Sequence, residues 1–234
     1  MALLLNTPNS RITKSAKNKV LAEALRPHVS QARFKSIEMC GSRKTFTGSD
    51  GITHQQEHRC KYRLCPYCAA SRKRKMLNGN RGRLDRSLRY MFLTGTHKDL
   101  KAITEADIGC LRKAANSLFR SKSMSWVAGG IKAHEVSYDG SRAEKWRLHF
   151  HALVPITTSF SNERKVRDSI NEYWKSRNAG AMHIGISGDY QTNCTRLRYL
   201  GKVNDNKGIL KDDLEELYLA TDRKQLINRF GSWL

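Results

Sequence analysis

The pattern of apolar and polar residues becomes regular from about residue 90 onward. Apolar side chains at every second position predict four strands, at residues 90–96, 131–138, 146–154 and 182–187. Apolar side chains three and four residues apart predict two helices. One opens at Thr104 with a capping box completed by Asp107, and the other starts at Ser161-Asn162. The predicted order of elements is therefore βαββαβ.

This order predicts an α+β fold. In the split-βαβ arrangement of ferredoxin-like and RNA-recognition-type (RRM-like) folds, an antiparallel sheet carries helices on one face and leaves the other face free. We expect this domain to span residues 90–204. Residues 1–89 are expected to form a basic, loop-rich module with a short helix over 16–25, and residues 205–234 one or two short amphipathic helices.

The strand at 146–154 carries two histidines, His149 and His151, that alternate with apolar residues. Residues i and i+2 of a strand share a face, so both imidazoles project to one side and Phe150 to the other. If the preceding turn is centred near Arg142, Glu135 lies opposite His149 and faces the same way. We expect Glu135, His149 and His151 to bind Mg²⁺ or Mn²⁺ with positions left open for a phosphate. The alternative is a pair of half-buried histidines satisfied by hydrogen bonds.

Four cysteines have the spacing of a zinc site. Cys60, Cys65 and Cys68 form a C-x4-C-x2-C array, and Cys40 lies upstream of it. In a reducing compartment such cysteines are more often metal ligands than disulfides. Because four thiolates make a closed tetrahedral site, we expect a structural Zn²⁺ ion in the module of residues 1–89.

The other histidines and cysteines leave alternatives open. His54 or His58 could replace Cys40 as the fourth zinc ligand. Cys110 and Cys194 fall on predicted helices, where we expect them to be ordinary buried thiols.

The composition adds a strong positive charge. The chain has 43 Lys and Arg against 21 Asp and Glu, a net charge of +22 and a pI near 10.1, which favours a polyanionic partner, above all nucleic acid. The basic run behind the cysteines is expected to follow phosphates. The predicted DNA-binding residues are Arg63, Arg72, Lys73, Arg74, Lys75 and Arg198. The chain has no long apolar stretch and its opening is too short for a signal-peptide core, so we expect a cytoplasmic protein without a membrane partner.

A further helix is expected from a cap at Thr192-Asn193 to about Val203. Its exposed side carries Tyr199 and Lys202, three residues apart. Beside a phosphate-binding metal, Tyr199 is a candidate nucleophile, because covalent catalysis conserves the phosphodiester energy in a phosphotyrosine. A phenol with a pKa of about 10 needs help to ionise, which Lys202 or the metal can give.

In sequence order these motifs resemble those of the HUH-type rolling-circle replication initiators of small plasmids. The resemblance covers residues 40–202 and rests on Cys40-Gly41, Cys60/Cys65/Cys68, residues 92–96, residues 134–138, residues 149–153 and residues 199–202. It implies that the paired histidines hold a metal that polarises the scissile phosphate, and that Tyr199 attacks this phosphate. It also implies nicking of one strand at a double-strand origin, a single-stranded or hairpin nick site, a 5′-phosphotyrosyl link and a free 3′-OH primer. The host helicase and replication machinery are the implied protein partners.

One position departs from the family pattern. Related initiators often carry a glutamate four residues before the tyrosine that helps to terminate replication, and Thr195 stands there in this chain. Asp189 and Asp205 are the nearest candidate acids to take its place. Termination chemistry is therefore an open point.

Three other functions compete with this interpretation. A transposase or relaxase with the same chemistry is the closest alternative. The histidine-triad nucleotide hydrolases need another histidine where Leu153 stands. A non-catalytic zinc protein that binds DNA or RNA through charge accounts for the cysteines, but it leaves the arrangement of Glu135, His149, His151 and Tyr199 unexplained.

Overall fold

The structure is a computed structural model that describes residues 14–62, 64–160, 162–177, 180–201, 204–205, 209, 211–221 and 224–233. The chain forms two compact units. Unit 1 comprises Met1–Arg74 and Lys207–Asp222, and unit 2 comprises Lys75–Asn206 and Arg223–Leu234. The functional boundaries expected after residues 89 and 204 remain predictions. Within the described ranges, no helix is long and apolar enough to cross a membrane.

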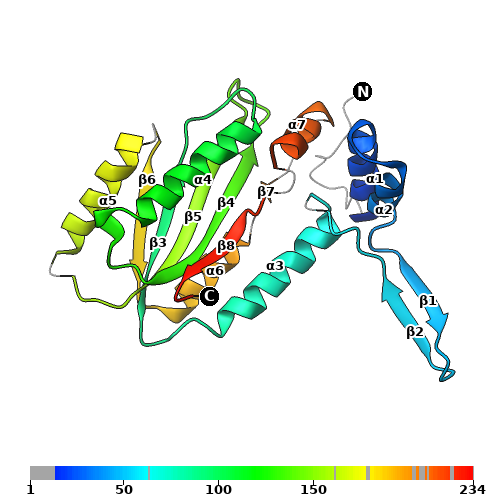
Figure 1. Cartoon of the computed structure of the whole chain (residues 1–234), viewed down its shortest axis with the longest axis horizontal. Coiled ribbons are helices and arrows are strands. Elements are labelled where there is room, and N and C mark those ends of the chain that lie inside the picture. Colours follow the sequence, from blue (N-terminus) through cyan, green and yellow to red (C-terminus); the bar gives the residue numbers. More distant parts are fainter. Residues whose placement is uncertain are drawn as a thin grey trace. The chain divides into compact units, whose positions relative to one another are not determined.

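Unit 1 consists of helices and one β-hairpin (Figure 1). Its elements are α1 (Lys14–Leu25), a 3₁₀ turn (Arg26–His28), α2 (Gln31–Glu38), β1 (Arg43–Thr47), β2 (Thr53–Glu57), the first part of α3 (Pro66–Arg81) and α7 (Lys211–Thr221). The expected helix over 16–25 is present as α1, whereas α2, the hairpin and α3 occupy segments expected to be loops. No strand residue of the hairpin is buried, so no alternation of buried and exposed positions marks it in the sequence.

The helices of unit 1 bring together distant parts of the sequence. α2 begins after Ser30, whose side chain accepts a hydrogen bond from the backbone N–H of Arg33. α7 packs against α1 and buries Leu217 completely, and His28 Nε2 lies 2.7 Å from Glu215 Oε1. Unit 1 therefore needs the segment after residue 206 to complete its core.

Unit 2 is a β-sheet with helices on both faces (Figure 1). Its strands are β3 (Arg89–Thr96), β4 (Gly129–Tyr138), β5 (Trp146–Ile156), β6 (Met182–Ser187), β7 (Asn204–Asp205) and β8 (Ile227–Gly231), and its helices are α4 (Glu105–Phe119), a 3₁₀ turn (Lys122–Met124), α5 (Glu163–Arg177) and α6 (Tyr190–Leu200). The antiparallel order is β6-β3-β5-β4-β8, and β7 pairs parallel with the outer edge of β4. The elements from β3 to β6 follow the predicted βαββαβ order.

One face of the sheet packs against α4 and α5. Phe150 on β5 is fully buried there, with its ring centroid 4.9 Å from that of Trp174 on α5 and 6.3 Å from that of Phe119 on α4. α4 begins with the predicted capping box, in which Thr104 and Asp107 exchange hydrogen bonds. The apolar side of β5 is thereby directed into a closed core.

The opposite face is not free, and this expectation was wrong. α6 packs on it, where Leu197 and Leu200 join Ile131 of β4, Leu153 of β5 and Trp233 in a second apolar cluster. The sequence pattern around residues 192–203 predicted a helix with an apolar stripe but could not show which surface that stripe covers. The histidine-bearing face of β5 is therefore partly enclosed.

Three local expectations are corrected as well. α6 is capped by Asp189, whose side chain accepts a hydrogen bond from the backbone N–H of Thr192, and not by Thr192-Asn193. The segment 227–231, expected to be helical, forms β8, because it pairs with the edge of β4 that would otherwise be open. Cys110, expected to be buried, is exposed on α4.

The contact between Gly95 and the core of the α4–α5 face gives a stability prediction. A Cβ atom at Gly95 would lie 2.2 Å from Phe150 Cε1 and 2.8 Å from Trp174 Cζ2, and both rings are fully buried. We expect Gly95→Ala to destabilise unit 2 by about 1–3 kcal/mol through overpacking, measured as a lower midpoint of thermal unfolding.

Gly109→Ala is the matched control. Gly109 lies inside α4, and a Cβ atom there would meet no other atom within 4 Å. This substitution should leave stability unchanged or raise it by up to about 1 kcal/mol, because alanine favours a helix interior over glycine. Equal unfolding midpoints for the two variants would contradict the packing described for Gly95.

Candidate functional site

Two histidines and a glutamate share one face of the sheet. Glu135 on β4 pairs with His149 on β5, in the register predicted from the hairpin turn, and Ala133 pairs with His151. Cross-strand partners project from the same face. The three candidate ligands therefore lie on the face that also carries α6.

The closest contact joins Glu135 to His151. Glu135 Oε2 lies 2.9 Å from His151 Nε2, and both side chains are nearly inaccessible, at 4% and 3% exposure. The ring of His149 stacks beside that of His151 with 6.0 Å between centroids, and His149 itself is half-buried. The site thus offers one carboxylate and two imidazoles at the boundary between core and solvent.

Thr94 on β3 orients His151 and was not given a role from the sequence. Its Oγ1 lies 3.0 Å from His151 Nδ1, because β3 pairs with β5 so that Thr94 stands opposite His151. A hydroxyl both donates and accepts, so it can bond Nδ1 in either tautomer of the imidazole. His151 can therefore donate Nε2–H to Glu135, or keep Nε2 free for a metal, without losing its contact with Thr94.

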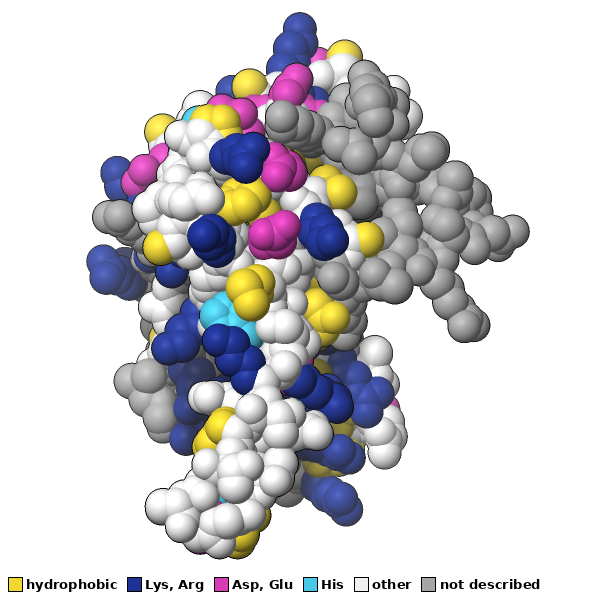
Figure 2. All heavy atoms as spheres, turned by 90° about the vertical axis from the view of Figure 1, so that its right-hand side faces the viewer, with side chains coloured by type: hydrophobic (Ala, Val, Ile, Leu, Met, Phe, Trp, Pro, Cys, Tyr) yellow, Lys and Arg dark blue, Asp and Glu magenta, His cyan; other side chains and the backbone are white. Residues whose placement is uncertain are grey.

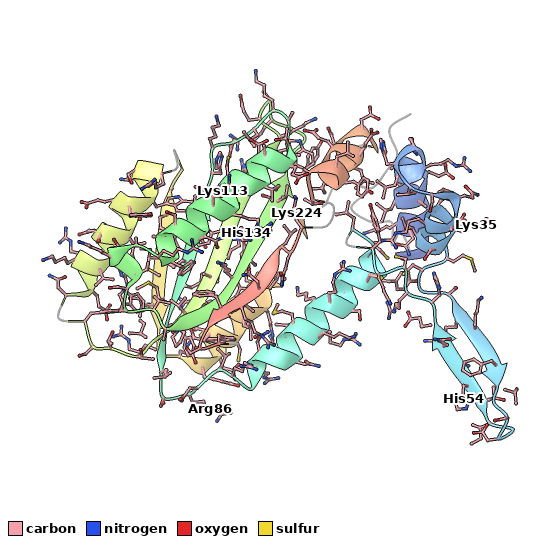
Figure 3. The ribbon with its side chains drawn as sticks, viewed as in Figure 1. Lys35, His54, Arg86, Lys113, His134 and Lys224 are labelled. Carbon is pink, nitrogen blue, oxygen red and sulfur yellow. The ribbon has the colours of Figure 1, made fainter. Side chains whose placement is uncertain are left out.

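His134 points away from this site, as its neighbouring position on β4 predicts. His134, labelled in Figure 3, is buried. Its burial and, to a smaller extent, the nearby charge of Lys132 lower the pKa of His134 to about 4. Lys132 lies on the same side, where its ammonium contacts Asn116 Oδ1 at 2.5 Å. His134 therefore remains a neutral residue of the interior near pH 7.

Tyr199 lies directly against His151. Its ring meets the ring of His151 edge-on, with 4.9 Å between centroids and an angle of 89°, and it meets Phe92 in the same manner at 6.2 Å. The side chain is 43% exposed. α6 brings Tyr199 here because its buried stripe, which includes Leu197 and Leu200, faces the sheet. A solvent-accessible phenol thus stands beside the candidate metal ligands.

Two further basic side chains lie on this face and were missed in the sequence. Arg196, one turn before Tyr199, places its guanidinium 5.8 Å from the ring centroid of Phe92, and burial lowers the pKa of Arg196. His183 on β6 is exposed and pairs with Thr94, so it shares the face. The strand pairing of β6 with β3 is the signal that could have identified His183.

Some predicted residues have other placements. Lys202 lies outside the described residues. Thr195 is exposed on α6, one helical turn before Tyr199. Of the two candidate replacements for a glutamate there, Asp189 caps α6, and its hydrogen bonds with Thr192 lower the pKa of its carboxyl. The side chain of Asp205 is not described.

The four predicted cysteines come together in unit 1. The sulfur atoms of Cys40, Cys60, Cys65 and Cys68 all lie within 4.8 Å of one another, and the four residues are buried. Among the residues that the structure describes, this is the one group of three or more His, Cys, Asp or Glu side chains gathered so closely. Gly41, beside Cys40, has a φ of +92° and packs against the ring of Tyr67, which only glycine allows. The arrangement is consistent with a zinc site.

The electrostatics of the cluster also favour a cation. Burial raises the pKa of Cys40 to about 12, and the hydrogen bond with Cys60 lowers the pKa of Cys65 to about 5. Four buried thiols this close cannot all ionise unless a positive charge compensates them. The two alternative ligands are engaged elsewhere, since His58 Nε2 lies 3.1 Å from Ser36 Oγ and His54 stacks on Phe46.

The basic residues behind the cysteines lie on α3. Arg74 and Lys75 are exposed and Lys73 is partly exposed, whereas Arg63 lies outside the described residues. Arg72 donates hydrogen bonds to the carbonyl oxygens of Lys61 and Tyr62 at 3.2 and 3.0 Å. This guanidinium stabilises the loop between Cys60 and Cys65. On α6, Arg198 is exposed.

Zinc content can be measured directly. We expect purified, reduced protein to contain about one zinc ion per chain, because four thiolates complete a tetrahedral site. Cys65→Ser should lose most of this zinc and weaken the folding of unit 1, since metal binding and folding are coupled. Metal analysis and thermal unfolding are the measurements.

Cys194→Ser is the control, because Cys194 is buried but lies outside the cluster. It should keep its zinc. Wild-type protein without zinc, or Cys65→Ser with a full complement, would contradict the assignment of the cluster.

Comparisons with known proteins concern most of the same residues. Residues 52–176 match Rep_1, a family described as replication protein. Two curated relatives, each named "Protein rep" and from a Bacillus species and from Bacillus amyloliquefaciens, are each 26% identical to the chain over 168 residues. The aligned part is 69% of this chain but 52% and 47% of the relatives, so the chain spans about half their length. No solved structure matches the chain.

The family match contains most of the candidate site. Glu135, His149 and His151 fall within residues 52–176, as do three of the four clustered cysteines, whereas Cys40 and Tyr199 lie outside this range. The matched residues make up more than half of the sequence. The chain therefore belongs to the Rep_1 family of replication proteins.

Proposed function

We propose that this protein is a plasmid rolling-circle replication initiator that nicks and rejoins one DNA strand through a 5′-phosphotyrosine at Tyr199. The observation that carries the proposal is the contact of the exposed Tyr199 ring with His151, which in turn contacts Glu135. The split-βαβ order of β3 to β6 supports an HUH endonuclease domain. The family of replication proteins supports an origin as the substrate.

The proposed catalytic metal fits its donor set. Glu135, His149 and His151 would hold it, and a carboxylate with two imidazoles suits a divalent ion that keeps open positions. Bound Mg²⁺ or Mn²⁺ supplies positive charge that polarises the scissile phosphate and stabilises the leaving oxygen. Thr94 holds the His151 ring in place through Nδ1, which leaves Nε2 directed at Glu135.

Tyr199 carries out the covalent step. Its phenol loses a proton and the oxygen attacks phosphorus, while the bond from phosphorus to the 3′ oxygen breaks. The 3′ oxygen takes up a proton and leaves as the 3′-OH, and the 5′ phosphate stays on Tyr199. The reverse attack by a 3′-OH rejoins the strand. We propose that Lys202, three residues after Tyr199 in the sequence, stabilises the phenolate.

The remaining features serve substrate binding. The net charge of +22 supports binding of a polyanion. The proposed phosphate contacts are the partly exposed Lys73 and the exposed Arg74 and Lys75 of α3, together with Arg198 of α6. The four clustered cysteines are proposed to hold Zn²⁺. The host helicase would then unwind the duplex, and the host replication machinery would extend the exposed 3′-OH.

The nucleophile can be tested with end-labelled DNA. Probes are hairpin oligonucleotides with randomised loops, incubated with Mn²⁺ and separated on a denaturing gel. A 5′-phosphotyrosyl link predicts that 3′-labelled DNA migrates with the protein, while 5′-labelled DNA is released as a shorter strand. Tyr199→Phe should abolish both products, because the attacking oxygen is missing. It should leave the fold intact, because no other atom is removed.

Tyr190→Phe serves as the matched control. Tyr190 begins the same helix, but Arg86 covers its ring, with 4.7 Å between the guanidinium carbon and the ring centroid. Its loss should leave the adduct at the wild-type level. An adduct that persists in Tyr199→Phe and disappears in Tyr190→Phe would identify Tyr190 as the nucleophile.

Thr195 gives a prediction about the end of the cycle. With no acid at this position, the phosphotyrosyl adduct should be hydrolysed slowly, although it can still be rejoined to DNA. Thr195→Glu should speed hydrolytic release of the isolated adduct more than it speeds nicking, because a carboxylate one turn before Tyr199 can reach water beside the phosphate.

Gln191→Glu adds the same charge two turns from Tyr199, and we expect it to change neither rate. If the wild type hydrolyses the adduct rapidly, and still does so after replacement of both Asp189 and Asp205, then the absence of an acid at Thr195 does not limit hydrolysis. Release of free DNA with time, followed on the same gels, measures both variants.

A further inference from the structure

The hairpin of β1 and β2 exposes all of its strand residues. Each of the ten strand residues is exposed, from Arg43 paired with Glu57 to Thr47 paired with Thr53. An isolated two-stranded hairpin is only marginally stable in water. Something must therefore fix its base, and the exposed surface needs an explanation.

The cysteine cluster fixes the base. Cys40 lies three residues before β1 and Cys60 three residues after β2, and the backbone N–H of Cys60 donates to Cys40 Sγ at 3.4 Å. Between the strands and the cluster, Gly41 N–H donates to the His58 carbonyl at 2.9 Å and His58 N–H to the Ser42 carbonyl at 2.8 Å. Both ends of the hairpin are therefore anchored at the buried cysteine cluster.

The exposed surface is mostly uncharged and able to form hydrogen bonds. One face presents Thr45, Thr47, Thr53 and Gln55, and the other presents Gln56 and the stacked rings of Phe46 and His54, 5.4 Å apart. Figure 2 shows the hairpin at the bottom of the view as a largely white projection, and Figure 3 marks His54 near its tip. Threonine and glutamine are side chains that read base edges.

The charges are arranged along the hairpin. Arg43, Lys44, Arg59 and Lys61 lie at the cysteine end. At the tip, Asp50 Oδ1 accepts a hydrogen bond from Ile52 N–H at 3.0 Å, and Asp50 Oδ2 lies 3.9 Å from His54 Nε2. Glu57 offsets one of the four positive charges at the cysteine end, since its Oε2 lies 2.6 Å from the guanidinium of Arg59. The cysteine end still carries more positive than negative charge and attracts a polyanion, whereas Asp50 is the acidic residue at the tip.

We propose that the β1–β2 hairpin inserts into the major groove of double-stranded DNA and selects the duplex site at which the protein loads. A two-stranded ribbon fits this groove, which is about 12 Å wide and 8.5 Å deep, and five strand residues extend about 17 Å. Thr45 and Gln55, which pair directly across the strands, contact base edges, and the basic residues at the base contact phosphates. The proposal rests on the proposed replication function but concerns choice of site, not strand cleavage.

The polar surface favours DNA over a protein partner. Among the hairpin residues, Phe46 and Ile52 are the large hydrophobics that are exposed, at 50% and 58%. Interfaces between proteins usually centre on a larger apolar cluster. In protein–DNA complexes, some side chains contact base edges and others contact phosphates. The hairpin fits this pattern, because one face carries Thr and Gln side chains and the basic residues lie at its cysteine end.

The test begins with selection from a randomised 30-base-pair duplex library, followed by binding of the selected and a scrambled duplex. Wild-type protein should prefer the selected duplex, and Thr45→Ala/Gln55→Ala should reduce this preference about tenfold. Lys44→Ala should instead weaken binding to both duplexes alike and reduce the salt dependence. Methyl green, which occupies the major groove, should displace wild-type protein from the duplex.

Gln31→Ala is the matched control, because Gln31 is an exposed glutamine on α2, away from the hairpin. It should keep the full preference. Adduct formation on single-stranded hairpin oligonucleotides and zinc content should be unchanged in the double variant, which separates loss of site choice from failure of the nicking function or of the fold.

Three results would overturn the proposal. They are a wild type that selects no duplex sequence, a double variant that retains full preference, and displacement by a minor-groove ligand but not by methyl green. If the double variant retains full preference for the selected duplex, and the hairpin is required to capture a protein, the hairpin binds a protein instead.

Discussion

Packing of Phe150 between Trp174 and Phe119 sets the geometry on which the candidate site depends. Because side chains alternate along β5, the burial of Phe150 in the core under α4 and α5 directs His149 and His151 to the opposite face. A slip of one residue in the pairing of β5 would turn both histidines into the core. The central place of β5 between β3 and β4 then supplies Thr94 from one side and Glu135 from the other.

The sequence predicted this part of the molecule because the physical signal is local. The period of two in β3 to β6 and the capping box of α4 depend on neighbouring residues, and the turn near Arg142 set the pairing of Glu135 with His149. The placement of α6 could not be read in the same way, since its apolar stripe fits either face of a sheet. Nor could the β1–β2 hairpin, whose residues are all exposed and whose base is held by cysteines outside the strands.

The two candidate metal sites differ in how strongly they depend on an ion. In unit 1, four buried sulfurs lie within 4.8 Å of one another, and they cannot all ionise unless a cation compensates their charge. In unit 2, Glu135 Oε2 and His151 Nε2 lie within hydrogen-bond distance, at 2.9 Å. The Thr94 hydroxyl can bond Nδ1 in either tautomer of His151. The first arrangement favours permanent occupancy, whereas the second can exist with or without an ion and so suits exchange.

The order in which the chain is made has a consequence for unit 1. α1 packs against α7, and Leu217 of α7 is fully buried, although the whole of β3 to α6 separates the two helices in the sequence. During synthesis, α1 therefore leaves the ribosome long before α7, the helix that packs against it, and most strands of the sheet of unit 2 are made in between. The amino-terminal helices would spend that interval with apolar surface exposed, a state prone to aggregation, unless the nearby cysteine cluster already holds them together.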